Sequence, residues 1–275
     1  MDKKISKGRQ WIVSALVAAA GFAAAGASAD PAPTLTPGTL KVGMQATYPP
    51  FEYYDGDKIE GADPELARAI AKQLGGSAAF VDTPLPQLIL GLNASRFDII
   101  MSAMYVTPER ASQATPIPYA QTGSAIMVAA STGLKPRTMQ DLCGMHLGIV
   151  QGTAWVGQLH DVSDHYCTPN GKPPIVVSEF GSTSYVLQAM LSNNVQAGMQ
   201  VAATAKALAD KSGGRVVVTS TDLINPQTIG IFVRKDNKPL HDAVVRALAE
   251  LKKSGEYDTL LQRYGLKPPP AASAS

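Results

Sequence analysis

Strand-like and helix-like patterns of apolar residues alternate along this chain. Short apolar runs typical of buried strands lie at 40–44 and 99–101, and between them the segments 64–74 and 85–92 repeat apolar residues every three or four positions. This order of strand, helix, strand, helix and strand predicts a mostly parallel sheet with helices on its faces.

The pattern changes character at 115–121, a second apolar strand is predicted at 124–130, and a second series of the same kind then begins. Its predicted elements are strands at 147–150, 175–178, 197–199 and 216–219, and helices from about 154 and over 182–191 and 202–209. A strand at 229–234 and amphipathic helices at 240–253 and 256–264 complete the pattern. Two α/β series joined by extended strands predict two lobes with a hinge. Ligands of such sheets bind beyond the carboxyl ends of the strands.

The N-terminal residues 1–29 have the composition of a cleaved signal peptide. Four basic residues lie before an apolar run at 11–25, and Ala27-Ser28-Ala29 provides a small-residue cleavage site. The alternative is an uncleaved membrane anchor, but the run is shorter than the ~20 apolar residues that a span requires. The sequence therefore predicts export to the periplasm.

The charge balance changes when this segment is removed. It holds four of the 24 basic and one of the 22 acidic residues, so the mature chain carries 20 and 21 and is formally −1. Without a basic excess, we expect no nucleic-acid binding. The proline-rich leader 30–39 and the Pro/Ala/Ser tail 265–275 are predicted to be disordered.

The chain has only two cysteines, Cys143 and Cys167. In an exported protein an isolated pair favours one disulfide, here closing a loop of about 25 residues. The alternative is a metal site that also uses the nearby residues His160, Asp161, Asp164 and His165. Their spacing matches no ligand pattern, so we expect neither a metal nor another cofactor.

The stretch from Asp98 to Arg110 has the features of an anion site. An apolar strand ends in small and polar residues, and Thr107 and Pro108 then predict a helix N-cap and the first helical position. Backbone amides at this helix start and the guanidinium of Arg110 together suit a carboxylate. This pattern favours a small-anion binder over an enzyme.

From about Leu40 to Tyr264 the chain resembles the periplasmic solute-binding proteins of polar amino-acid ABC transporters, such as the histidine-, lysine/arginine/ornithine- and glutamine-binding proteins. The resemblance depends on Thr47-Tyr-Pro-Pro-Phe51-Glu52, Gly61-Ala-Asp-Pro-Glu65-Leu66-Ala67, Asp98 to Arg110, Leu142-Cys-Gly144, Gln151-Gly-Thr153 and Gly255-Glu-Tyr257. It implies two lobes, 40–122 with 221–264 and 123–220, that close around a ligand and present it to a membrane permease. We expect a monomer.

The resemblance also implies roles for individual residues. Arg110 would clamp the ligand carboxylate, with help from Ser102 and from the backbone near Ala103 and Tyr105, and Tyr48 would stack on the ligand. Leu85 stands where several relatives carry a second aromatic ring. From the second lobe the loop of Thr153, Ala154 and Trp155 would face the ligand.

Alternative interpretations remain open for four of these residues. Arg110 could be a surface arginine paired with Glu109 or Glu65, and Tyr48 could belong to the core. Thr153 could be only a helix N-cap, and Trp155 could simply pack under its helix.

Two positions differ from the family pattern. Gln45 stands where relatives often have an Asp that meets the ligand side chain, and Val201 stands where they place the Asp that receives the α-ammonium. Gln200 could offer its amide oxygen instead. Because a buried ammonium without a counter-charge is costly, these changes argue against a cationic amino acid. Neutral amino acids, modified amino acids and plain carboxylates stay open.

Three functions are compatible with the sequence. The first is a binding protein of an ABC importer, which needs no catalysis. The second is an enzyme similar to periplasmic cyclohexadienyl dehydratases, for which Glu179 is the spare carboxylate. The third is a stand-alone ligand sensor.

Overall fold

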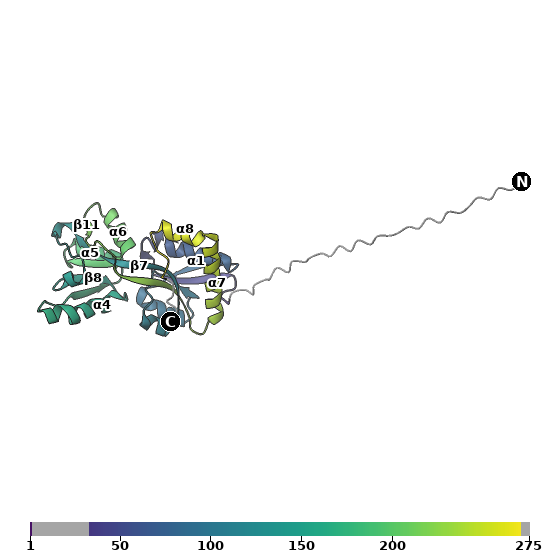
Figure 1. Ribbon diagram of the computed structural model, residues 1–275, viewed down its shortest axis with the longest axis horizontal. Helices are drawn as coiled ribbons and strands as arrows, with labels where there is room; N and C mark the ends of the chain where they lie inside the picture. Colours follow the sequence, from purple (N-terminus) through teal and green to yellow (C-terminus); the bar gives the residue numbers. More distant parts are fainter. Residues whose placement is uncertain (2–32, 271–275) are drawn as a thin grey trace. The chain divides into compact units, whose positions relative to one another are not determined.

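The computed structural model describes Met1 and residues 33–270 (Figure 1). The rest of the predicted signal peptide and its cleavage site lie outside the described residues, as do residues 271–275. Among the helices that are described, none combines the length and the apolar character required to cross a bilayer.

The elements follow the predicted alternation of strands and helices. The strands are β1 (Thr39–Met44), β2 (Thr47–Tyr48), β3 (Glu52–Asp55), β4 (Lys58–Glu60), β5 (Ser77–Asp82), β6 (Ile99–Ile100), β7 (Thr115–Ala129), β8 (His146–Val150), β9 (Val176–Phe180), β10 (Ala197–Val201), β11 (Val216–Val218) and β12 (Ile224–Val233). The helices are α1 (Ala62–Gln73), α2 (Leu88–Asn93), α3 (Pro108–Gln113), α4 (Trp155–Val162), α5 (Thr183–Leu191), α6 (Ala202–Lys211), α7 (Lys238–Ser254) and α8 (Glu256–Arg263).

One mixed sheet runs through both halves of the fold, in the order β5-β1-β6-β12-β7-β10-β8-β9 with β11 also on β7. The pairs of β1 with β5 and β6, and of β8 with β9 and β10, are parallel. The long strand β7 pairs antiparallel with β12 near its start and with β10 and β11 near its end. In Figure 1, β7 lies between a group containing α1, α7 and α8 and a group containing α4, α5 and α6.

This arrangement confirms the two-lobe α/β prediction. We call the part built on β1, β5 and β6 the first lobe and the part built on β8, β9 and β10 the second lobe. The carboxyl ends of these parallel strands are where the site is expected. The lobe boundaries given above stay a prediction.

A separate hairpin sheet, β2-β3-β4, leads into α1 and positions its first turn. Gly61, which precedes α1, has a φ of +127°, and a Cβ there would lie 2.2 Å from the carbonyl oxygen of Phe51. Only glycine permits this close approach. It brings Asp63, in the first turn of α1, into the interior beside the hairpin.

The ends of the described chain are more structured than the composition suggests. The amide of Leu35 donates to Asp98 at 2.6 Å, within the leader for which we predicted disorder. At the other end, Lys267 exchanges backbone hydrogen bonds with Gln121, and Leu266 is buried. These partners are distant in sequence, so the local composition does not indicate them.

The predicted disulfide between Cys143 and Cys167 is present, with a Cα–Cα distance of 5.6 Å. It connects the chain just before β8 with the short helical turn that follows α4. Within residues 33–270, no group of three or more His, Cys, Asp and Glu side chains could hold a metal ion.

Candidate functional site

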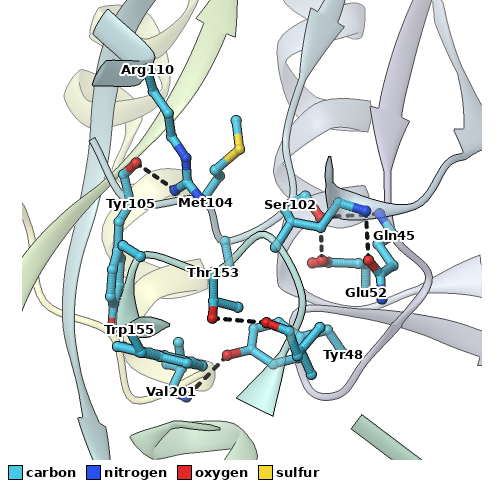
Figure 2. A pocket seen from close by; sticks show the side chains of 14 residues that line it. Gln45, Tyr48, Glu52, Ser102, Met104, Tyr105, Arg110, Thr153, Trp155 and Val201 are labelled. Atoms are coloured by element: carbon cyan, nitrogen blue, oxygen red, sulfur yellow. Dashed lines mark hydrogen bonds between the residues drawn. The ribbon is translucent and has the colours of Figure 1, made fainter. Parts of the chain in front are cut away.

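A cavity with about 470 Å³ of empty space, partly open to solvent, lies between the two lobes (Figure 2). The cavity is lined by residues at or just after the carboxyl ends of strands from both lobes, where the sheet topology predicts a site. The lining residues are Gln45, Tyr48, Glu52, Leu85, Ser102, Ala103, Met104, Tyr105, Arg110, Val150, Thr153, Ala154, Trp155 and Val201.

The start of α3 holds Arg110 at this cavity. Thr107 caps the helix by accepting from the Arg110 amide at 3.2 Å, and Pro108 occupies the first helical position, as predicted. The guanidinium donates to the carbonyl oxygens of Tyr105 (2.9 Å) and Gly152 (2.8 Å). A guanidinium has further N–H donors, which remain for a ligand.

Arg110 has no carboxylate partner among the ion pairs of residues 33–270. Burial lowers the pKa of its guanidinium to about 10, although the nearby Glu109 acts in the opposite direction. The group therefore stays charged at neutral pH. Glu65, the alternative partner considered above, instead bonds Arg263 and Tyr264. A partly buried cation without a counter-charge favours an anionic ligand.

Three hydrogen bonds cross the cleft between the lobes. Besides the bond from Arg110 to Gly152, the Val201 amide donates to the Tyr48 hydroxyl at 3.0 Å, and Gln45 Nε2 donates to the Gly181 carbonyl at 3.1 Å. Each bond joins a side chain of the first lobe to the main chain of the second. The lobes are thus in contact around the cavity.

The carboxamide of Gln45 is fully engaged, which explains the residue type. Its Oε1 accepts from the Leu85 amide at 2.6 Å, while its Nε2 donates to Thr47 and across the cleft to Gly181. An ionised carboxylate could accept the first bond but donate neither of the others. Here Gln45 is better described as a bridge between the lobes than as a selector of charged ligands.

A buried acid pair, Glu52 and Asp63, lies at the cavity, and Glu52 is one of its lining residues. The Ser102 hydroxyl donates to Glu52 Oε1 at 2.7 Å, and Asp63 accepts from the Tyr119 hydroxyl (2.6 Å) and the Ala103 amide (2.7 Å). Burial and then the charge of Asp63 raise the pKa of Glu52 well above its usual range. Burial also raises the pKa of Asp63 to about 6, against its hydrogen bonds. Burial and the neighbouring Asp63 therefore disfavour the ionised form of Glu52.

Aromatic rings form the walls of the cavity. Tyr105 and Trp155 meet edge to face, with centroids 6.0 Å apart and an interplanar angle of 83°. Tyr48 stacks on Phe51 at 5.9 Å, and Phe51 itself belongs to the core. Figure 2 shows Tyr105 and Trp155 together on one wall and Tyr48 near Val201.

The structure brings together all but one of the predicted ligand-binding residues. Those that line the cavity are Gln45, Tyr48, Leu85, Ser102, Ala103, Tyr105, Arg110, Thr153, Ala154 and Trp155. Gln200 does not line it. Side chains alternate across a strand, and in β10 it is the neighbour Val201 that faces the cavity.

Two of the alternatives above concern the second-lobe loop. Thr153 does not cap α4, because its hydroxyl donates to the Val150 carbonyl at 2.8 Å and Ala154 is the residue before the helix. Trp155 is buried at the start of α4, and it lines the cavity. Glu179, the spare carboxylate of the enzyme hypothesis, is exposed on β9 and is not a lining residue.

Sequence reasoning did not assign Glu52, Met104 and Val150 to the site. Val150 ends the parallel strand β8, and this position alone could have indicated it. Met104 lies between two residues that were assigned, but it resembles an ordinary core residue. Glu52 precedes solvent-exposed hairpin residues, and nothing in the sequence pattern indicates that it is buried.

Comparison with known proteins supports this architecture. Residues 40–267 match the family model of the bacterial extracellular solute-binding proteins, family 3. The chain belongs to this family. As a family 3 solute-binding protein it is 28% identical over 259 residues to the histidine-binding periplasmic protein of Escherichia coli (strain K12), covering 90% of this chain and 96% of that one.

Two solved structures of binding proteins are also similar to this solute-binding protein. One is an ancestral arginine-binding protein bound to glutamine, with a TM-score of 0.74, 30% identity and coverage of 82% of this chain and 97% of that one. The other is an ancestral amino acid-binding protein described as a precursor of cyclohexadienyl dehydratase. Its TM-score is 0.69 and its identity 29%, covering 82% of this chain and 95% of that one.

Proposed function

We propose that the cavity binds a small carboxylate, an amino acid or a close analogue, and that Arg110 is its carboxylate anchor. The chain would hold this ligand in the periplasm and deliver it to the permease of an ABC importer, without catalysis. The supporting observation is the Arg110 guanidinium at the cavity, which lacks a carboxylate partner within residues 33–270.

Closure of the two lobes would couple binding to delivery. The three bonds that cross the cleft form only when the lobes are together, so a ligand that also touches both lobes stabilises the same state. Relatives whose names describe histidine-, arginine- and cystine-binding proteins support a ligand of amino-acid size.

The test is isothermal titration of the mature protein with a panel of amino acids, 2-oxo acids and dicarboxylic acids. Arg110→Lys keeps the charge but loses the bidentate geometry, and we expect it to weaken binding of the best acid at least roughly tenfold. The matched control is Arg68→Lys, on the surface and paired with Glu60, which should not change affinity. Unchanged affinity of Arg110→Lys, with its folding intact, would refute the anchor role.

A second candidate function is elimination from a cyclic carboxylate substrate, and Glu52 is the observation that favours it. A buried carboxyl with a raised pKa at a cavity is what a general acid requires. An assay of prephenate and arogenate turnover separates the two candidates. Product formation that Glu52→Gln abolishes would establish an enzyme and exclude a purely binding role.

A further inference from the structure

Ala103, a residue of the cavity wall, has an unusual backbone conformation. Its φ of +43° lies in the left-handed region, which non-glycine residues rarely adopt. The other non-glycine residues with a positive φ in residues 33–270 are Ser95, Asn193 and Asn225, and all three are exposed, whereas Ala103 is buried. Strained backbone persists only where neighbouring groups enforce it, and it is concentrated at functional sites.

The amide of Ala103 is bonded to a buried acid. It donates to Asp63 Oδ2 at 2.7 Å, and the Tyr119 hydroxyl donates to Asp63 Oδ1 at 2.6 Å. Asp63 and Tyr119 are both buried, so water does not compete for either bond. The acid comes from the first turn of α1, 40 residues earlier in the chain. Its two oxygens connect the cavity wall at Ala103 to the core.

The residue before Ala103 is held by the other buried acid. The Ser102 hydroxyl donates to Glu52 Oε1 at 2.7 Å and accepts from the Gln45 amide at 3.0 Å. The hydroxyl hydrogen of Ser102 and the amide hydrogen of Ala103 are therefore both used inside the protein. The two acids together hold the turn at residues 102–103, and only the bond from Asp63 is made to the strained residue itself.

The turn at Ala103 leads directly to the segment that holds Arg110. Residues 104–106 pair with β12 through backbone hydrogen bonds of 3.1 and 2.9 Å. Tyr105 is the middle residue of this pairing, and its carbonyl accepts from the Arg110 guanidinium at 2.9 Å. The backbone conformation of Ala103 sets the direction in which the chain enters the pairing. It therefore affects where the carbonyl that holds Arg110 lies.

We propose that Asp63 is a positioning residue of the carboxylate site. By accepting from the Ala103 amide, it keeps the strained turn in the conformation that places the Tyr105 carbonyl, and with it Arg110, at the cavity. Asp63 is not a lining residue of the cavity, so it acts on a ligand only through this segment. The inference rests on the proposed function, in which Arg110 binds the ligand carboxylate.

Titration calorimetry at pH 7.5 tests this role on the mature protein. The probe is whichever of histidine, glutamine, leucine, phenylalanine and phenylpyruvate binds the wild type most tightly. Asp63→Ala leaves the left-handed Ala103 unsupported, so we expect its dissociation constant to be at least roughly fivefold higher. Asp63→Asn keeps an acceptor for the amide, and its NH₂ group can donate to the Tyr119 hydroxyl. It should therefore recover most of the affinity that Asp63→Ala loses.

Tyr119→Phe is the matched control. It removes the other hydrogen bond of Asp63 in the same buried environment, but it does not alter the acceptor of the Ala103 amide. We expect a lower melting temperature and an unchanged dissociation constant for the probe. If Tyr119→Phe weakens binding as much as Asp63→Ala, the loss reflects general destabilisation and the inference is wrong.

A double variant separates positioning from stability in a second way. Glycine adopts the left-handed region without strain, so Asp63→Ala/Ala103→Gly needs no acceptor to hold the turn. It should bind the probe at least roughly threefold more tightly than Asp63→Ala does. Its melting temperature should remain low, because the buried Tyr119 hydroxyl still lacks its acceptor. Affinity lost only through lower stability would not be recovered in this way.

Hydrogen exchange provides a test that needs no variant, in case Asp63→Ala does not fold. Measured by NMR on the wild type, the Ala103 amide should exchange only as slowly as the core amides do. Rapid exchange of this amide in the folded protein would show that Asp63 does not hold the turn.

The outcomes distinguish this inference from the proposed function beneath it. If Arg110→Lys weakens binding of the probe and Asp63→Ala does not, the inference is wrong and the proposed function stands. The same conclusion follows if the double variant binds no better than Asp63→Ala. If none of the five acids shows binding that depends on Arg110, the proposed function is wrong and the inference with it.

Discussion

Gly152, in the loop after β8, lies directly against Pro86 across the cleft. A Cβ placed on Gly152 would be 3.0 Å from Cγ and 3.1 Å from the nitrogen of Pro86. The Gly152 carbonyl also accepts from Arg110 at 2.8 Å. The absence of a side chain at this residue therefore lets the two lobes approach each other beside the carboxylate anchor.

Gly152→Ala should weaken ligand binding by opposing lobe closure. Gly152 has a φ of +76°, and Gly133 has a similar φ of +66° but open space around it. Both alanine variants lose stability to backbone strain, roughly 1–2 kcal/mol each. Only Gly152→Ala meets the opposite lobe, so only it should reduce the affinity measured by calorimetry. Equal affinities of the two variants would contradict this prediction.

Tyr48→Phe should weaken binding through the loss of a bond across the cleft. The Val201 amide donates to the Tyr48 hydroxyl at 3.0 Å, and the variant leaves that buried amide without its partner in the closed state. The penalty for such a group is about 1–3 kcal/mol, which predicts at least a several-fold higher dissociation constant. Tyr54→Phe is the control, since that hydroxyl bonds Asp82 at the surface. If the two variants have the same dissociation constant, the Tyr48 hydroxyl has no role in closure.

The buried acid pair should make stability depend on pH. Burial raises the pKa of Asp63 to about 6 and that of Glu52 well above its usual range. The folded state then binds protons more tightly than the unfolded chain. The contribution of this pair to the free energy of unfolding is largest at acidic pH, below the unfolded pKa values, and is lost as the pH rises through the folded ones.

Glu52→Gln should remove much of this dependence, because glutamine resembles the neutral carboxyl and keeps an acceptor for Ser102. We expect it to raise the free energy of unfolding at pH 7.5 by on the order of 1 kcal/mol and to change it little at pH 4. Urea unfolding at both pH values measures the difference from the wild type. Glu60→Gln, at an exposed ion pair with Arg68, is the control. A variant with the wild-type pH profile would show that Glu52 does not titrate in this way.

Removing the disulfide should lower stability without changing the ligand preference. Cys143 and Cys167 are 24 residues apart, and a closed loop of this size contributes roughly 3 kcal/mol on the chain-entropy model. We expect the Cys143→Ser/Cys167→Ser double variant to melt at a lower temperature and to bind the same acid. Identical melting of the wild type with and without a reducing agent would argue against a stabilising role.

Much of the fold follows from the sequence because it depends on local patterns. Apolar periodicity predicted the alternation of strands and helices, and therefore two α/β lobes with the site at the carboxyl ends of their strands. Thr107 and Pro108 marked the start of α3, which fixes Arg110, through chemistry confined to one helix turn. An isolated cysteine pair was sufficient to predict the disulfide.

The tertiary structure decided which face each residue presents and which distant partners it has. Gln200 and Val201 are neighbours in sequence, but the alternation of β10 places only Val201 at the cavity. Glu52 is buried, and Gly61 lets α1 approach the hairpin and bring the second buried acid, Asp63, beside it. Gln45 accepts from the Leu85 amide and donates to the Gly181 carbonyl, a combination that an ionised carboxylate could not make. Such roles depend on contacts between residues far apart in the chain, and burial and charge are properties of those contacts rather than of a residue type.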